Sequence, residues 1–198
     1  MPLNENFETI AQNNQHQAWQ VIEQSGVVKI WESFGATVNL VGSLAMGLLM
    51  NHKDIDLHIY TDTLDVAASF NVIQNICKNP AVKSLEYRNL ADTGEACLEW
   101  HIKFLSDNAE EWQIDMIQIL KGSQFDGYFE RVAERIKAEL TPEMRRTILE
   151  LKYQTPASEH IMGIEYYRAV LAGGVRTYAE LIKYRQDHPV DGIDPWCP

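Results

Sequence analysis

The segment DIDLHIY, residues 54–60, is the feature of the sequence that most constrains the fold. Its apolar side chains are Ile55, Leu57 and Ile59, and its polar side chains are Asp54, Asp56, His58 and Tyr60. This period of two predicts a β-strand that buries one face and leaves the other polar. The polar face then carries two carboxylates separated by a single residue.

Two interpretations of Asp54 and Asp56 are open from the strand alone. Side chains two residues apart on a strand point the same way, with Cα atoms about 6.5–7 Å apart. The two carboxylates could therefore converge on a hard cation such as Mg²⁺, without which they repel and one keeps its proton. In the alternative, both simply face water, as polar strand residues usually do.

The rest of the first 122 residues reads as strands and helices in alternation. An apolar fraction of 45% over 198 residues is enough for a buried core. Helical spacing is found at residues 15–34, interrupted by Gly26, and at residues 64–79. The other predicted strands are ATVNLVGS before the DIDLHIY run, and VKSLEYRN, ACLEWHIKFLS and EEWQIDMIQIL after it.

The periodicity changes after Gly122. Four helical segments follow, at residues 125–140, 141–154, 157–174 and 175–188, and residues 191–198 read as an irregular tail. The sequence therefore predicts an α+β fold. Residues 1–122 form a mixed β-sheet domain with helices on one face, and residues 123–198 form a C-terminal helical subdomain.

Charge and cysteine content limit the partners and the compartment. With 17 Lys and Arg against 28 Asp and Glu, the net charge of −11 repels nucleic acid at long range, so no extensive nucleic-acid binding is expected. Three cysteines without a CxxC motif fit a reducing compartment. The N-terminus lacks a signal-peptide profile and no apolar run approaches about 20 residues, so we predict a cytoplasmic protein that does not enter a membrane.

A second motif precedes the acidic strand. Gly42 and Ser43 close the preceding predicted strand, where small residues let a backbone N–H and a hydroxyl approach a phosphate. The combined pattern is G-S-x3-G-x6-D-I-D-L, with Gly47 as its later glycine. This pattern resembles the signature of the nucleotidyltransferase superfamily with the DNA-polymerase-beta-like fold, especially its minimal and antibiotic-modifying bacterial members. The resemblance covers about residues 36–120.

The resemblance implies a role for each motif residue. Gly42 and Ser43 would hold the phosphates of a nucleoside triphosphate, and Asp54 and Asp56 would hold Mg²⁺. The family also has a third carboxylate on a later strand, and Asp115 in WQIDMIQI takes that place.

Two residues depart from the pattern or compete with it. Glu99, in LEWHIKF, is the alternative third carboxylate, although a solvated strand face explains it more simply. Lys53 stands where members of the family commonly have a serine before the first aspartate.

The reaction implied by the resemblance is metal-dependent nucleotidyl transfer. An acceptor hydroxyl of a small molecule or protein attacks the α-phosphate of a nucleoside triphosphate, ATP among them, and pyrophosphate leaves. Two Mg²⁺ ions, or Mn²⁺, would sit between Asp54, Asp56 and Asp115, and Asp115 would take the acceptor's proton.

Two other interpretations keep the same fold: a degenerate nucleotide-binding or interaction module without catalysis, and a hydrolase or other phosphotransferase using the same metal pair. The sequence leaves the acceptor, the nucleotide and the oligomeric state open.

Overall fold

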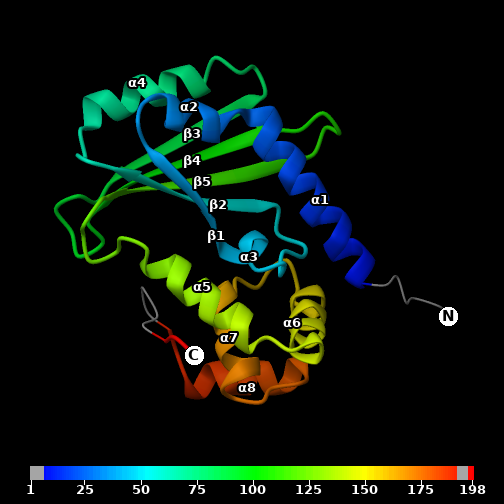
Figure 1. Ribbon diagram of the computed structural model, residues 1–198. Coiled ribbons are helices and arrows are strands. Elements are labelled where there is room, and N and C mark those ends of the chain that lie inside the picture. Colours follow the sequence, from blue (N-terminus) through cyan, green and yellow to red (C-terminus); the bar gives the residue numbers. More distant parts are fainter. Residues whose placement is uncertain (1–6, 191–195) are drawn as a thin grey trace.

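The computed structural model describes residues 7–190 and 196–198 of the chain. Its centre is a five-stranded sheet in the order β1-β2-β5-β4-β3 (Figure 1). The strands are β1 Thr37–Val41, β2 Asp54–Thr61, β3 Val82–Asn89, β4 Cys97–Leu105 and β5 Glu111–Leu120. β2 and β5 run parallel and all other neighbours are antiparallel, so the predicted mixed sheet is confirmed.

Three helices cover one face of this sheet (Figure 1). They are α1 Phe7–Ser25, α2 Val27–Ser33 and α4 Val66–Ile76. Trp31 of α2 and Ile73 of α4 pack with Ile55 and Ile114 of the sheet in one buried core. The apolar face of DIDLHIY is therefore turned to these helices, as its alternation predicts.

The break between α1 and α2 lies at Gly26, as the sequence indicates. Its φ of 69° is in the left-handed region, which an L side chain rarely adopts. The predicted beginning of the first helix at about residue 15 is too late, because α1 begins at Phe7. The polar residues before Gln15 obscured its period in the sequence, yet Ala11 is fully buried against Met50 and Leu149.

Four of the other helices lie together on the opposite side of the sheet (Figure 1). They are α5 Tyr128–Glu139, α6 Pro142–Gln154, α7 Gly163–Leu171 and α8 Tyr178–Asp187. Residues 125–188 contain helices and no strand, as the sequence predicts. The division of the chain into two domains near residue 122 stays a prediction.

The third of these helices begins later than the sequence predicts. Helical spacing extends back to Ala157, but α7 begins at Gly163. Met162 caps it, because the Glu165 side chain accepts a hydrogen bond from the Met162 backbone N–H at 2.8 Å. Residues 191–195 of the predicted tail lie outside the described residues.

The loop between α3 (Gly42–Ala45) and β2 connects the sheet to the helical half. Met46 and Leu48 are buried in the core that α5 to α8 form. Gln15 of α1 donates hydrogen bonds to the carbonyls of Gly47 and Leu49 at 3.1 and 3.3 Å. These contacts hold helices α5 to α8, called the helical half below, next to the sheet face that carries Asp54 and Asp56. Within residues 7–190 and 196–198, none of the helices has the length and apolar character to cross a membrane.

Candidate active site

The acidic residues of β2 face away from the core. Ile55, Leu57 and Ile59 are at most 1% exposed, whereas Asp54 and Asp56 are partly accessible on the opposite face. Both aspartates line a cleft of about 500 Å³ between the sheet and the helical half.

Asp115 lies directly beside Asp56. β5 pairs with β2 in parallel, and the register sets Asp56 opposite Asp115. A slip of one residue would turn Asp115 to the core face. The register therefore brings all three predicted carboxylates to one face, although Asp115 borders the cleft and is not part of its lining.

The carboxylate of Asp115 is held by two neighbours. His101 of β4 places Nδ1 2.6 Å from Asp115 Oδ1. Gln113 donates to both oxygens, at 2.8 and 3.0 Å. The hydrogen bond to Asp115 and the adjacent acids raise the pKa of His101. The raised pKa favours the protonated imidazole, whose positive charge would offset part of the acidic face.

The Gly-Ser turn packs against the second aspartate. Gly42 has a φ of 67°, and a Cβ at this position would lie 2.6 Å from Asp56 Cγ and overlap its Oδ2. Val41 of β1 pairs with Asp56 of β2, so the turn that follows Val41 is held next to Asp56. Only glycine fits here, and Gly42 and Ser43 both line the cleft.

The electrostatics of this face favour a bound cation. Burial, Asp54 and Asp115 raise the pKa of Asp56 to about 8. Asp54 Oδ1 is buried and has no hydrogen-bond partner in the part of the chain that the structure describes. A buried carboxylate oxygen without a donor costs free energy that a cation would recover. Mg²⁺ prefers oxygen ligands, and this face offers three carboxylates, including the unpaired oxygen of Asp54. The residues present therefore fit this ion.

Lys152 and Tyr167 also face the acidic pair. Lys152, on α6, donates from Nζ to the Leu48 carbonyl at 3.0 Å and to Tyr167 Oη at 3.2 Å. Burial lowers the pKa of Lys152 to about 8, although Asp54 and Asp56 act in the opposite direction. Both residues line the cleft. No motif marked them in the sequence, because they meet the aspartates only through folding.

Glu99 and Lys53, the competing acid and the departure from the family pattern, lie outside the cleft. Glu99 of β4 is 3.4 Å from His101 Nε2 and does not line the cleft. Lys53 forms an ion pair with Glu110 at 2.5 Å. Of the two candidate third carboxylates, Asp115 is the one that lies directly opposite Asp56, whereas Glu99 lies opposite Ile117 on the next strand.

Comparison with known proteins places the fold. No family model matches the chain. Valine–tRNA ligase of Methanothrix thermoacetophila is 39% identical over 72 residues, which are 35% of this chain and 8% of the ligase. So short a match shows no family.

Solved polymerase structures match over most of the chain. A poly(A) polymerase complex, GLD-2 with GLD-3, matches with a TM-score of 0.52 at 14% identity, over 91% of this chain and 54% of that one. The Cid1 poly(U) polymerase bound to MgATP matches with a TM-score of 0.57 at 12% identity, over 84% and 55%. A cytoplasmic RNA terminal U-transferase matches with a TM-score of 0.52 at 14% identity, over 85% and 53%.

These likenesses establish the fold. The chain has the mixed-sheet α+β fold of nucleotidyltransferases, as the G-S and D-I-D motifs predict. It spans little more than half the length of these three polymerases.

Proposed function

We propose that this chain carries the active site of a metal-dependent nucleotidyltransferase, which moves a nucleoside monophosphate from a nucleoside triphosphate to an acceptor hydroxyl. The observation that carries the proposal is the gathering of Asp54, Asp56 and Asp115 on one sheet face, with Gly42 packed on Asp56. The nucleotidyltransferase fold and the cleft above these residues support it.

The turn and the helical half would hold the triphosphate. Ser43 Oγ and the backbone N–H of Gly42 would donate to phosphate oxygens, since both residues line the cleft. Lys152 would supply a positive charge from the opposite wall. These contacts would orient the α-phosphate toward the aspartates.

The three carboxylates would hold the metal and accept the proton. Asp54, Asp56 and Asp115 are the residues that would bind two Mg²⁺ ions, or Mn²⁺. When bound, the metal neutralises phosphate charge and stabilises the charge that develops during transfer. Asp115 would accept the acceptor's proton at its carboxylate, and His101 and Gln113 would keep that carboxylate oriented.

We propose a small molecule or a protein side chain as the acceptor. The net charge of −11 opposes a long anionic acceptor and favours a cationic one. One protein of similar fold is named an RNA terminal U-transferase, so a short RNA with a free 3′ hydroxyl is the alternative to test. The three cysteines are unpaired, which agrees with the cytoplasmic location that we propose.

The direct test is pyrophosphate release from each of the four nucleoside triphosphates with Mg²⁺. The acceptor panel contains cationic aminoglycosides, neutral polyols, a hydroxyl-rich unfolded protein and a short RNA. We expect release with one acceptor class, and none from Asp56→Asn. Triphosphate binding without turnover on any acceptor would instead support a non-catalytic module.

A further inference from the structure

A second hollow, of about 220 Å³, lies on the same sheet face and takes no part in the proposed transfer. His58, Ile117 and Phe129 line both this hollow and the cleft. The remaining lining residues are Glu95, Cys97, Glu99, Ile119 and Phe125.

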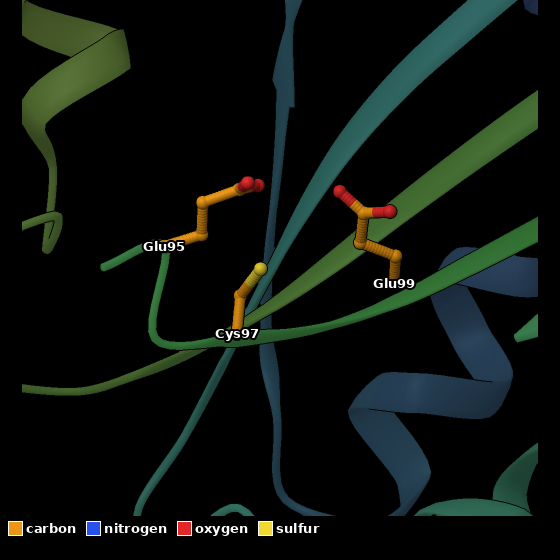
Figure 2. A group of neighbouring side chains, drawn as sticks. All are labelled: Glu95, Cys97 and Glu99. Atoms are coloured by element: carbon orange, nitrogen blue, oxygen red, sulfur yellow. The ribbon is translucent and has the colours of Figure 1, made fainter. Parts of the chain in front are cut away.

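Three of these residues offer metal-binding atoms at one point. Cys97 and Glu99 alternate at the beginning of β4, so their side chains share a face, and Glu95 lies in the turn just before the strand (Figure 2). Their ligand atoms lie within 4.8 Å of one another. In Figure 2 the two carboxylates face each other across the Cys97 thiol, which is 4% exposed.

His58 brings an independent observation from another strand. It is 6% exposed, and its buried Nδ1 has no hydrogen-bond partner among the described residues. Its Nδ1 faces Glu130 Oε1 at 3.8 Å. A metal-binding imidazole usually directs one ring nitrogen to a carboxylate and gives the other to the metal. His58 has such a carboxylate beside it and lines the same hollow as the three other residues, although it is outside the group of ligand atoms that lie within 4.8 Å of one another.

We propose that Glu95, Cys97 and Glu99 form a zinc site, and that His58 moves from the wall of the hollow to become the fourth ligand when the ion binds. One sulfur, one imidazole nitrogen and two carboxylates are a donor set that Zn²⁺ accepts in tetrahedral geometry. Mg²⁺ prefers oxygen ligands and would remain at the aspartates. The ion would link β4 to β2 across β5, because the sheet order separates these strands by one.

The surroundings also argue against a redox role for Cys97. Burial, Glu99 and Glu95 raise the pKa of its thiol to about 11. Without a metal the thiol therefore stays protonated and reacts poorly. On binding, Zn²⁺ replaces the thiol proton, which passes to solvent.

The test is titration of the whole chain with Zn²⁺, and with Co²⁺ as a spectroscopic probe, in excess Mg²⁺. We expect one tightly bound ion per chain and a thiolate-to-cobalt charge-transfer band. Cys97→Ser should abolish the band. Both Cys97→Ser and Glu95→Gln should weaken zinc binding, each by at least about 10–100-fold. Glu95 is exposed, so its replacement tests the site without disturbing the core.

Two controls separate this site from other thiols and from the cleft. Cys77→Ser, at an exposed cysteine, and Asp54→Asn, in the cleft, should leave the band and the affinity unchanged. The proposal is overturned if wild type binds no Zn²⁺ in excess Mg²⁺. It is equally overturned if Cys97→Ser, shown to be folded by circular dichroism, keeps the band, or if Asp54→Asn loses the ion.

Discussion

Asp56 and Glu130 are two carboxylates on the polar side of the same sheet, in opposite electrostatic environments. Burial and the neighbouring Asp54 and Asp115 raise the pKa of Asp56 to about 8. Burial alone would raise the pKa of Glu130 as well, but His58, Tyr60 and Asn39 overcome it and lower that pKa to about 2.

The difference lies in the donors that surround each group. Glu130 of α5 accepts from Tyr60 Oη at 2.7 and 2.9 Å and from Asn39 Nδ2 at 3.0 Å. It therefore joins the helical half to β1 and β2 as a negative charge with its partners in place. Asp56 has Asp54 and Asp115 beside it, and burial together with these acids outweighs Lys152 and His101, so its ionised form lacks enough positive charge nearby, which a metal would supply. We infer that Glu130 serves the fold and Asp56 serves binding.

The largest effect should come from removing the charge of Asp56. Asp56→Asn should reduce pyrophosphate release to background, because a proposed metal ligand is lost. Its melting temperature in EDTA should equal or exceed that of wild type, because repulsion with Asp54 and Asp115 is relieved. Transfer at the wild-type rate would exclude Asp56 from the active site.

The second-largest effect should come from a substitution that places an atom in the space that the Asp56 carboxylate occupies. Gly42→Ala puts a Cβ against the Asp56 carboxylate at a φ of 67°. We expect destabilisation by more than the ~1–2 kcal/mol that left-handed backbone costs an L residue, together with loss of the stabilisation by Mg²⁺. Gly35→Ala is the matched control, because its φ is 85° and nothing lies within 4 Å of its Cβ. Equal denaturant midpoints for the two variants would contradict the contact.

Glu130 should show the opposite behaviour to Asp56. Glu130→Gln should destabilise the protein by about 1–3 kcal/mol in urea, because charged hydrogen bonds to Tyr60 and Asn39 are lost. Glu134→Gln, at an exposed position of the same helix, should have little effect. A stability loss of equal size in both variants would show that the hydrogen-bonded position is not special.

The pH dependence of stability in acid should also show the role of Glu130. The pKa of Glu130 falls from 4.5 in the unfolded chain to about 2 in the fold. Its stabilisation is therefore complete above about pH 4.5 and is lost as the pH falls toward 2. Urea unfolding from pH 5 to 2 should show a smaller loss of stability in Glu130→Gln than in wild type. Parallel curves would contradict the lowered pKa.

A smaller effect is expected at the turn. Ser43→Ala should weaken triphosphate binding about tenfold, because one hydrogen bond to a charged phosphate is worth at least ~1.5 kcal/mol. Calorimetric titration with Mg²⁺ and a non-hydrolysable triphosphate measures it. An unchanged affinity would mean that the hydroxyl does not touch phosphate.

The sequence predicted the elements whose signals are local. Alternation in DIDLHIY identified the strand and the face of Asp54 and Asp56, and Gly42 marked a turn that only glycine can make. Asp115 was predicted as the third carboxylate from the family resemblance, and the register of β2 with β5 brings it to Asp56.

The missed residues depend on contacts distant in sequence. Lys152 reaches the cleft from 104 residues beyond Leu48, and Glu130 meets Tyr60 from 70 residues away. Each lies in an amphipathic helix where one more charged residue is unremarkable. Periodicity therefore predicts which face a residue occupies, but not which distant residue it meets.

The most direct measurement of the central claim is the melting temperature with and without Mg²⁺. Wild type should melt at a higher temperature with Mg²⁺, because the ion binds the native state in preference to the unfolded chain. Glu130→Gln should melt lower than wild type yet keep the Mg²⁺-dependent rise, whereas Asp56→Asn should lose the rise. The same rise in Asp56→Asn as in wild type would contradict a metal site at the three aspartates.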